Sequence, residues 1–228
     1  MSAQGPGKVI KFREANQRLL SSSKWIKRQP ITDLGHRIVA ATVDEFAAKG
    51  VQGARVAEIT RRAGTTDPNF YRYFVGLRQA ALFIISEYYW APLNKRINHY
   101  REATTAADKL LDLVVTSLIR SAEDDPARPW LAESKVFQIV VAESRNPLLL
   151  PDAALEAEYV SFLAAIENTI RDGQKQKLFK PSFKPALVAS LLVDTLHGVL
   201  ARRALGHRGF ELNEDAVRRL AYHLVGKQ

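Results

Sequence analysis

Two short amphipathic segments separated by a glycine turn constrain the fold of this chain more than any other feature. In the segment VAEITRRA, Val56, Ile59 and Ala63 recur at spacings of three and four residues, which predicts a short helix with one apolar stripe. Gly64 follows as a residue that can adopt the left-handed conformation in which many helices end. Thr66 can then cap a second helix, whose first turn contains Asp and Pro, both favoured at that position.

The second segment, PNFYRYF, predicts a helix with one buried and one exposed face. Phe70 and Phe74 share the apolar face, so we expect Asn69, Arg72 and Tyr73 to point away from it. Two helices joined by a turn of three to four residues containing glycine form a helix-turn-helix, in which the second helix can enter the major groove of DNA.

The sequence from Arg37 to Phe74 resembles, without a gap, the TetR family of bacterial transcriptional regulators. The matching positions are Ile38, Ala41, Phe46, Gly50, Val56, Ile59, Ala63, Gly64, Thr66, Tyr71 and Phe74. The resemblance implies an all-α fold, with a three-helix helix-turn-helix DNA-binding domain at residues 33–78 and a larger helical effector-binding and dimerisation domain at residues 79–228.

The resemblance also implies which side chains contact DNA. They are Arg55, Thr66, Asp67, Asn69, Tyr71, Arg72 and Tyr73. Asp67 and Asn69 would face the bases, because Asn can pair with adenine and Asp can accept a hydrogen bond from cytosine. Thr66, Tyr71 and Tyr73 would contact phosphates. Two alternatives stay open: Asp67 only complements the helix dipole, and Arg72 is only a solvated surface charge.

Two positions depart from the family pattern. Arg55 stands where the family usually opens the second helix with Ser or Thr, so the cap is lost, but an arginine can grip a phosphate itself. Leu77 stands where a lysine commonly follows the aromatic motif, and two replacements for its phosphate contact stay open: Arg78 or the basic residues 1–32.

Positive charge is concentrated at the N-terminal end of the chain. Residues 1–32 contain seven basic residues and one acid, a net charge of +6, whereas the whole chain carries +9. This basic extension lies next to the proposed DNA reader, as phosphate binding requires. Three interpretations stay open for it: a tail that tracks phosphates or enters a minor groove, an amphipathic helix VIKFREANQRLL that packs on a subunit, or disorder.

The remainder of the chain has helical periodicity interrupted by prolines. The expected helices are QAALFIISEYYWAPLNKRI, kinked by Pro92, then AADKLLDLVVTSLIRSAED, RPWLAESKVFQIVVAES, ALEAEYVSFLAAIENTIRDG, KPALVASLLVDTLHGVLARRAL and NEDAVRRLAYHLVG. None shows the alternation of a strand. Length and the family resemblance indicate that these helices form one effector-binding and dimerisation domain.

Family members commonly bind a small-molecule effector among these helices. The candidate ligand-binding residues are Tyr89, Trp130, Phe137, Glu143, Tyr159 and His197. Aromatic residues at helical spacing also serve as ordinary core. His197 can equally be a satisfied core histidine, and Glu143 can pair with Arg145 or cap a neighbouring helix. For the homodimer interface we expect Leu192, Leu196 and Val199, on a helix too apolar to stand alone.

These features favour a cytoplasmic repressor that an effector releases from a palindromic double-stranded DNA operator. A regulator whose larger domain senses a protein is the alternative. An all-helical enzyme is disfavoured, because the chain has no cysteine, no phosphate-binding glycine loop and no metal-ligand spacing among its five histidines. We expect no cofactor and no metal. Neither a secretory signal nor a membrane span is expected, since no apolar run approaches about eighteen residues.

Overall fold

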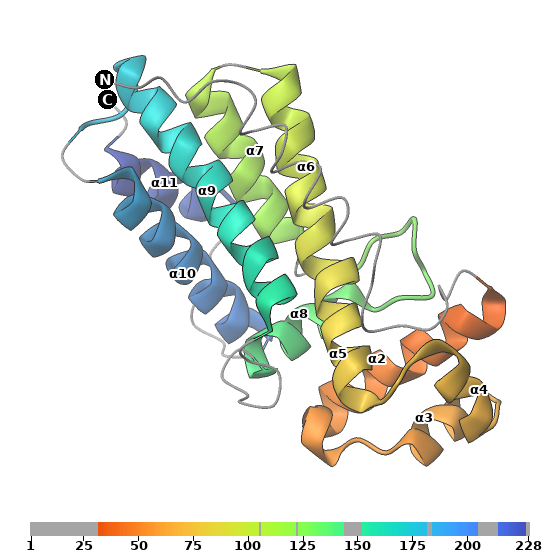
Figure 1. The fold of residues 1–228 in the computed structure, drawn as a ribbon. Helices are drawn as coiled ribbons and strands as arrows, with labels where there is room; N and C mark the ends of the chain where they lie inside the picture. The colour runs from red at the N-terminus through yellow and green to blue at the C-terminus, as the bar shows by residue number, and fades with distance from the viewer. Residues whose placement is uncertain are drawn as a thin grey trace.

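The structure is a computed structural model that describes residues 32–226 except 105, 122, 144–151, 182–183 and 205–213. Every regular element in these ranges is helical (Figure 1). The helices are α2 (Asp33–Gly53), α3 (Val56–Arg62), α4 (Asp67–Tyr73), α5 (Leu77–Ile85), the π-helical turn η1 (Ser86–Trp90), α6 (Ala91–Ala103), α7 (Ala107–Arg120), α8 (Glu133–Glu143), α9 (Ala153–Lys175), α10 (Pro185–Ala204) and α11 (Glu214–Val225). The all-α prediction is confirmed.

Helices α2, α3 and α4 form a small unit at one end of the molecule (Figure 1). Its core contains Ile38, Phe46, Ile59, Phe70 and Phe74, each at most 2% exposed. These residues come from all three helices and from the residue that follows α4, so none of the three could bury its apolar stripe alone.

Gly50 ends the regular part of α2. Its φ of 68° is left-handed, a conformation that favours glycine, and it turns the chain out of the helical path. Because of this turn the backbone N–H of Val51 leaves the helical hydrogen-bond ladder and needs another acceptor.

Helices α5, η1 and α6 form one continuous rod from the small unit into the larger domain (Figure 1). Pro92 lacks the N–H that an α-helix requires, so the predicted interruption of this helix is confirmed. The interruption is a π-helical turn rather than a break: the Ala91 N–H bonds to the carbonyl of Ser86, five residues back. Such bulges change the direction of the side chains that follow.

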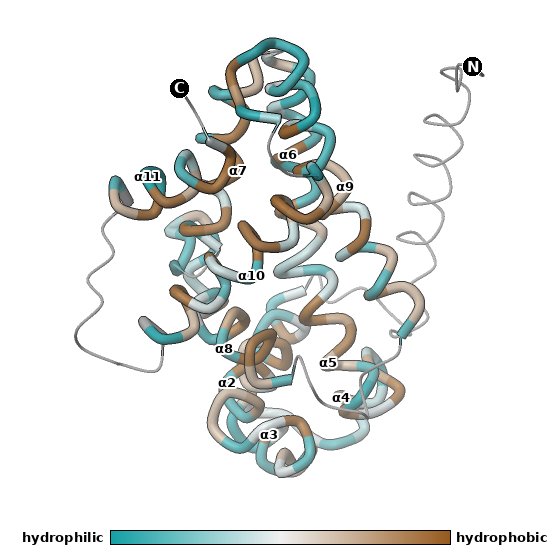
Figure 2. The backbone as a smooth tube through the Cα atoms, turned by 90° about the vertical axis from the view of Figure 1, so that its left-hand side faces the viewer, coloured by the Kyte–Doolittle hydropathy of each residue, from teal (hydrophilic) through white to brown (hydrophobic). Residues whose placement is uncertain are grey.

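The larger domain packs helices α6 to α11 around a shared apolar core. The extensive contacts are between α9 and α10, α7 and α9, and α6 and α7. Figure 2 shows hydrophobic and hydrophilic segments alternating along these helices, as amphipathic helices require. Most helix bounds lie within a few residues of the prediction; α8 begins later, at Glu133, since the preceding residues form the link that packs on α2.

Helix α10 is more apolar than its burial in one protomer explains. Among the described residues it is the one helix, over Pro185–Arg202, that is long and apolar enough to cross a membrane, and 33% of that stretch is buried. Leu187 and Leu191 are 51% and 46% exposed. An apolar surface of this kind is typical of a contact with another chain or a lipid.

The C-terminal end of α9 supplies a test of the packing. A Cβ atom on Gly173 would lie 2.1 Å from Cδ2 of Phe179, a buried residue of the following turn. We expect Gly173→Ala to lower the free energy of unfolding by about 1–3 kcal/mol, because the ring must move out of a packed core. Urea unfolding followed by circular dichroism measures this, and an unchanged midpoint would contradict the placement of Phe179.

Candidate nucleic-acid interface and the interior of the larger domain

The turn between α3 and α4 has the geometry of a Schellman motif. The Thr65 N–H bonds to the Thr60 carbonyl at 2.9 Å, and the Gly64 N–H bonds to the Arg61 carbonyl at 3.2 Å. Gly64 has φ 62°, and open space surrounds it, so its backbone conformation alone requires glycine. The predicted helix end at Gly64 is confirmed, and the turn fixes the direction in which α4 leaves.

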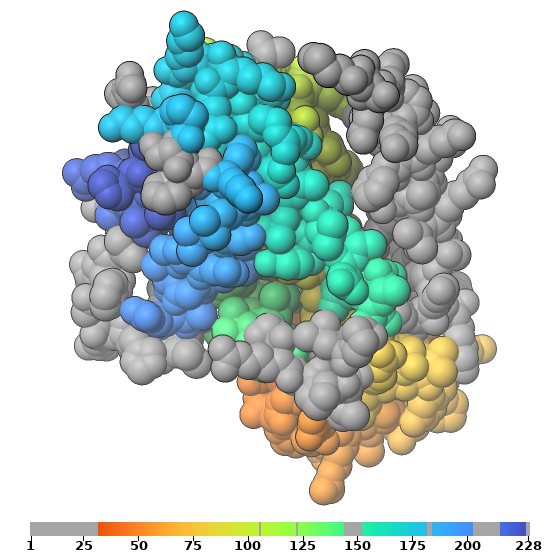
Figure 3. All heavy atoms as spheres, turned by 60° about the vertical axis from the view of Figure 1, so that its left-hand side comes forward, coloured from red at the N-terminus to blue at the C-terminus, as the bar shows by residue number. Residues whose placement is uncertain are grey.

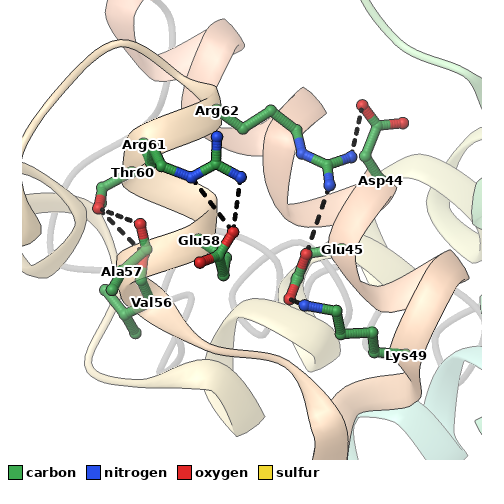
Figure 4. A network of polar contacts seen from close by, with 9 residues as sticks. All are labelled: Asp44, Glu45, Lys49, Val56, Ala57, Glu58, Thr60, Arg61 and Arg62. Carbon is green, nitrogen blue, oxygen red and sulfur yellow. Dashed lines mark hydrogen bonds and ion pairs between the residues drawn. The ribbon is translucent and has the colours of Figure 1, made fainter.

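A side-chain hydrogen bond connects the two helices of the motif. The Thr60 hydroxyl donates to a carboxylate oxygen of Asp67 at 2.5 Å, and it also lies within bonding distance of the Val56 and Ala57 carbonyls (Figure 4). Asp67 is therefore held against α3 from the first position of α4, where its charge also complements the helix dipole. The hydrogen bond uses Oδ1 of Asp67, so Oδ2 is the oxygen that can accept from another group.

The outer face of α4 presents the polar side chains that the sequence predicts there. Thr66 caps this helix by position, without a side-chain cap bond. Asn69 donates from Nδ2 to the Thr65 hydroxyl at 2.8 Å and accepts from Arg72 at 3.3 Å. Tyr71 is 44% exposed. These side chains gather on one exposed surface, which we call the α4 face.

Tyr73 does not belong to the α4 face. It is 4% exposed, and its hydroxyl lies 2.9 Å from the hydroxyl of Thr32, the residue that caps α2. The prediction that Tyr73 points away from the core is wrong, because a third helix packs where the sequence pattern of α4 alone leaves that side open. Its hydroxyl instead ties α4 to the start of α2.

The two basic positions that depart from the family pattern lie in different surroundings. Arg55 is the exposed N-terminal cap residue of α3, and its side chain makes no cap hydrogen bond, as the sequence predicts. Arg78, in the first turn of α5, lies with Nη2 3.8 Å from Oδ2 of Asp152, the N-cap of α9. Arg78 thus connects the start of α5 with the larger domain.

An ion-pair network holds α3 on α2 (Figure 4). Arg62 of α3 reaches Asp44 at 3.6 Å and Glu45 at 3.5 Å, and Lys49 reaches Glu45 at 2.8 Å. The Glu45 side chain is fully buried. A buried carboxylate is strongly destabilising without its partners, so this network fixes the position of α3 relative to α2.

Helix α8 of the larger domain lies along α2 and bonds to it at two places. Lys135 forms an ion pair with Asp44, which extends the network of Figure 4 into the larger domain. Glu143, 8% exposed, accepts at Oε1 from the backbone N–H of Val51 at 2.9 Å. The sequence predicts Glu143 as a ligand-binding residue, whereas in the structure it lies between the two domains, because the left-handed turn at Gly50 leaves the Val51 N–H free to bond to it.

Trp130 also lies between the domains rather than inside the larger one. Its ring stacks on His36 of α2, with centroids 4.2 Å apart and planes at 9°, and its edge contacts Tyr88 of η1. The role of Trp130 as a ligand-binding residue stays a prediction. Its position follows from the link before α8, which must cross α2.

The other predicted ligand residues surround Trp90 and Tyr89 in the interior of the larger domain. The Tyr89 hydroxyl lies 2.8 Å from Nε2 of His197, and Phe137 packs against both rings. Tyr159 contacts Trp90 at 5.4 Å between centroids. Burial lowers the pKa of His197 to about 4, so its imidazole is neutral at neutral pH. Tyr89, Phe137, Tyr159 and His197 thus come together as one aromatic cluster.

Two of the three predicted dimer residues face inward. Leu192 is fully buried and Leu196 is 1% exposed within a single protomer, while Val199 is half-buried. The prediction for Leu192 and Leu196 is wrong, since α10 uses that face to pack on α9. Its exposed apolar residues are Leu187 and Leu191, and Val160 of α9 is 49% exposed.

Sequence reasoning missed several contacts that shape these sites. The bond from Thr60 to Asp67 spans seven residues, and a polar residue in the apolar stripe of α3 was the signal for it. The bond from Ser86 to Glu158 joins residues 72 positions apart, for which no local pattern exists. No group of three or more His, Asp or Glu side chains within the described ranges could hold a metal ion.

Comparison with known proteins identifies the N-terminal unit. Residues 38–78 match the model of a family described as bacterial regulatory proteins, tetR family. The chain is 28% identical over 104 residues to YdgC of Bacillus subtilis (strain 168), an uncharacterised HTH-type transcriptional regulator. That alignment covers 46% of each protein, so it spans about half the length of the curated relative.

Solved structures share the fold over most of the chain. FadR from Bacillus subtilis, solved with stearoyl-CoA, has a TM-score of 0.65 and 18% identity, covering 83% of this chain and 96% of FadR. AibR, solved with isovaleryl coenzyme A and operator DNA, has a TM-score of 0.63 and 14% identity, covering 84% of this chain and 97% of AibR. At these identities the likeness establishes the fold.

The bond between Thr60 and Asp67 can be tested by paired substitutions. Thr60→Val removes the hydroxyl but keeps the shape, so we expect a loss of about 1 kcal/mol in the free energy of unfolding. Thr60→Ser keeps the donor and should retain more of this stability. Denaturant unfolding of both variants measures the difference, and equal midpoints would show that the hydrogen bond contributes nothing.

Proposed function

We propose that the chain is a TetR-family regulator, as the match of residues 38–78 to that family supports, and that it is a homodimeric DNA-binding transcriptional repressor. A small-molecule effector, bound in the larger domain, releases it from a palindromic operator. The observation that carries this proposal is the α4 face: polar side chains on an exposed helix whose direction is fixed by the turn at Gly64.

The α4 face supplies chemistry for both base and phosphate contacts. Asn69 can exchange its internal partners for the edge of an adenine, and the remaining carboxylate oxygen of Asp67 can accept from a cytosine. Tyr71 and Arg72 are exposed beside them and can reach phosphates, as can Thr66 at the start of the helix. Arg55, at the N-terminus of α3, is placed to bind a phosphate on a flanking strand.

Two such faces must be held together to read a palindrome, about 34–36 Å apart for this class of motif. The exposed apolar residues Leu187, Leu191 and Val160 lie on the adjacent helices α9 and α10. Packed against the same surface of a second copy, they would form a four-helix interface with two-fold symmetry. This interface also accounts for the apolarity of α10.

Helix α8 is the element through which the effector would act on the DNA reader. Phe137 of this helix belongs to the aromatic cluster. Lys135 and Glu143 of the same helix bond to α2. A ligand that displaces Phe137 must therefore move groups that position α2, since α8 is a rigid helix. The ion pair between Arg78 and Asp152 is a further contact between the start of α5 and the larger domain.

A regulator whose larger domain senses a protein uses the same α4 face. The aromatic cluster favours a small molecule, because the rings of Tyr89, Trp90 and Phe137 are buried, although Tyr159 and His197 are partly exposed. Release of operator DNA by a small compound, without added protein, supports the effector proposal; release that requires a protein partner supports the alternative.

Two substitutions distinguish contacts with bases from contacts with phosphates. Asn69→Ala should cost about 1–3 kcal/mol of discrimination between operator and random DNA, since a base contact is lost. Arg55→Ala should weaken binding to all sequences and lower the slope of log K against log salt by about 1. Fluorescence anisotropy titrations at several salt concentrations measure both effects.

Arg101→Ala is the matched control for Arg55→Ala, because Arg101 is an exposed arginine in the last turn of α6, far along the chain from the reader. Its salt slope should equal that of the unmodified protein. Equal losses on operator and random DNA for Asn69→Ala would exclude Asn69 as a base contact.

The dimer interface is tested by placing a charge on the exposed apolar surface. Leu191→Glu should convert the dimer to monomer at micromolar concentration, because a carboxylate would be buried against apolar side chains without a partner. Sedimentation velocity measures the change. Lys95→Glu, at an exposed position of α6, is the control and should stay dimeric; a dimeric Leu191→Glu variant would place the interface elsewhere.

A further inference from the structure

Trp90 is the centre of the aromatic cluster in the larger domain. Its ring contacts Tyr89, Tyr159, Phe162 and His197, with centroid separations between 4.8 and 5.9 Å. The contacts are edge-on or tilted rather than stacked. Faces of aromatic rings carry partial negative charge and attract cations.

A carboxyl group lies beside this cluster. Glu158 and Phe162 are one helical turn apart on α9, so they share a face of that helix. Glu158 accepts from the hydroxyl of Ser86, and Phe162 packs on Trp90, four residues beyond Ser86 in η1. The Glu158 carboxyl is therefore about one turn away from the Trp90 ring.

Only half of the Glu158 carboxyl is satisfied. Oε1 bonds to Ser86, whereas Oε2 is buried and has no hydrogen-bond partner among the described residues. The nearby Asn94 amide donates from Nδ2 to the backbone carbonyl of Glu158 at 3.1 Å rather than to its carboxyl. A buried carboxylate oxygen without a partner is costly, and a ligand that supplies positive charge would offset that cost.

The surroundings of the carboxyl are electrically negative. Burial, reinforced by the charge of Glu87, raises the pKa of Glu158 to about 7 against the effect of the Ser86 hydrogen bond. Asp194 is an exposed residue of α10 whose negative charge raises the pKa of both Tyr159 and His197. It has no ion pair in the described part of the chain. His197 is neutral, so it contributes no opposing charge.

We propose that the larger domain binds an organic cation with an aromatic or bulky apolar body, its positive group held between the Glu158 carboxyl and the rings of Trp90, Tyr159 and Phe162. This inference rests on the proposed function, in which the same domain holds the effector, and it names the chemical class of that effector. Figure 3 shows α8 set back behind α9 and α10, the two helices that carry Glu158, Tyr159 and His197.

One buried positive charge, that of Arg96, would favour an anionic ligand instead. Its Nε is buried without a hydrogen-bond partner in the described residues, and its charge acts on Tyr89 and on Glu133. Glu133 is 8% exposed and opposes that charge, whereas Glu158 has no base among the groups that shift its pKa. The carboxyl therefore favours a cation, and binding of an anion is the competing outcome.

Three probes with one aromatic body separate these outcomes. They are (2-naphthylmethyl)trimethylammonium, its neutral carbon isostere 2-neopentylnaphthalene, and the anion 2-naphthylacetate. We expect quenching of tryptophan fluorescence and the tightest binding for the cation, at least about tenfold tighter than for the neutral compound, a difference of about 1.4 kcal/mol. Isothermal titration calorimetry on the full-length protein gives the dissociation constants.

Glu158→Gln removes the charge and keeps an acceptor for Ser86. It should weaken the cation at least about tenfold and leave the neutral compound unchanged. Cation binding to the unmodified protein at pH 7 should also release about half a proton, because the carboxyl becomes fully ionised; Glu158→Gln should release none. Glu156→Gln, an exposed carboxylate in the first turn of α9, is the matched control and should behave as the unmodified protein.

A purely structural role for Glu158 would change the melting temperature without changing the preference for the cation, and that result overturns the inference. Equal affinity for the three probes, or tightest binding of 2-naphthylacetate, overturns it as well. Operator binding is measured separately: a protein that binds operator but prefers the anion keeps the proposed function and loses this inference. A protein that prefers the cation but binds no operator keeps this inference and loses the proposed function.

Discussion

The hydrogen bond from the Val51 N–H to Glu143 is the contact on which the arrangement of the two domains depends. It exists because Gly50 takes a left-handed conformation that removes Val51 from the helical ladder, and because α8 lies close enough to supply a buried carboxylate. Lys135 and Asp44 add an ion pair along the same pair of helices. These two contacts thus connect α2 of the DNA-binding unit directly to α8.

The continuous rod of α5, η1 and α6 is the second connection, and the π-helical turn divides its side chains between two environments. Tyr88 contacts Phe83 and Trp130, in the aromatic contacts that lead toward α2. Tyr89 and Trp90 contact the interior cluster instead. Neighbouring residues of one short turn therefore touch both the aromatic contacts that lead toward α2 and the interior cluster of the larger domain.

Local patterns predicted the elements well, because the information for them lies within a few residues. Gly64 ends α3 as its freedom to adopt positive φ predicts, and Pro92 interrupts its helix because it lacks an N–H. The polar face of α4 was also predictable, with Tyr73 as the exception: which side of a short helix is buried depends on a third helix. The contacts of Glu143 and Trp130 with α2 could not be predicted, because their partners are about 90 residues away in the sequence.

The sequence by itself determined the helical fold, the turn of the DNA reader and the concentration of polar groups on α4, since each follows from spacing, backbone freedom and charge within one segment. The tertiary structure decided which apolar face of α10 is left exposed, which aromatic residues reach the interior, and that Oε2 of Glu158 is buried without a hydrogen-bond partner among the described residues. These outcomes depend on which helices pack together, and a residue's burial or charge environment is a property of that packing rather than of its neighbours in the chain.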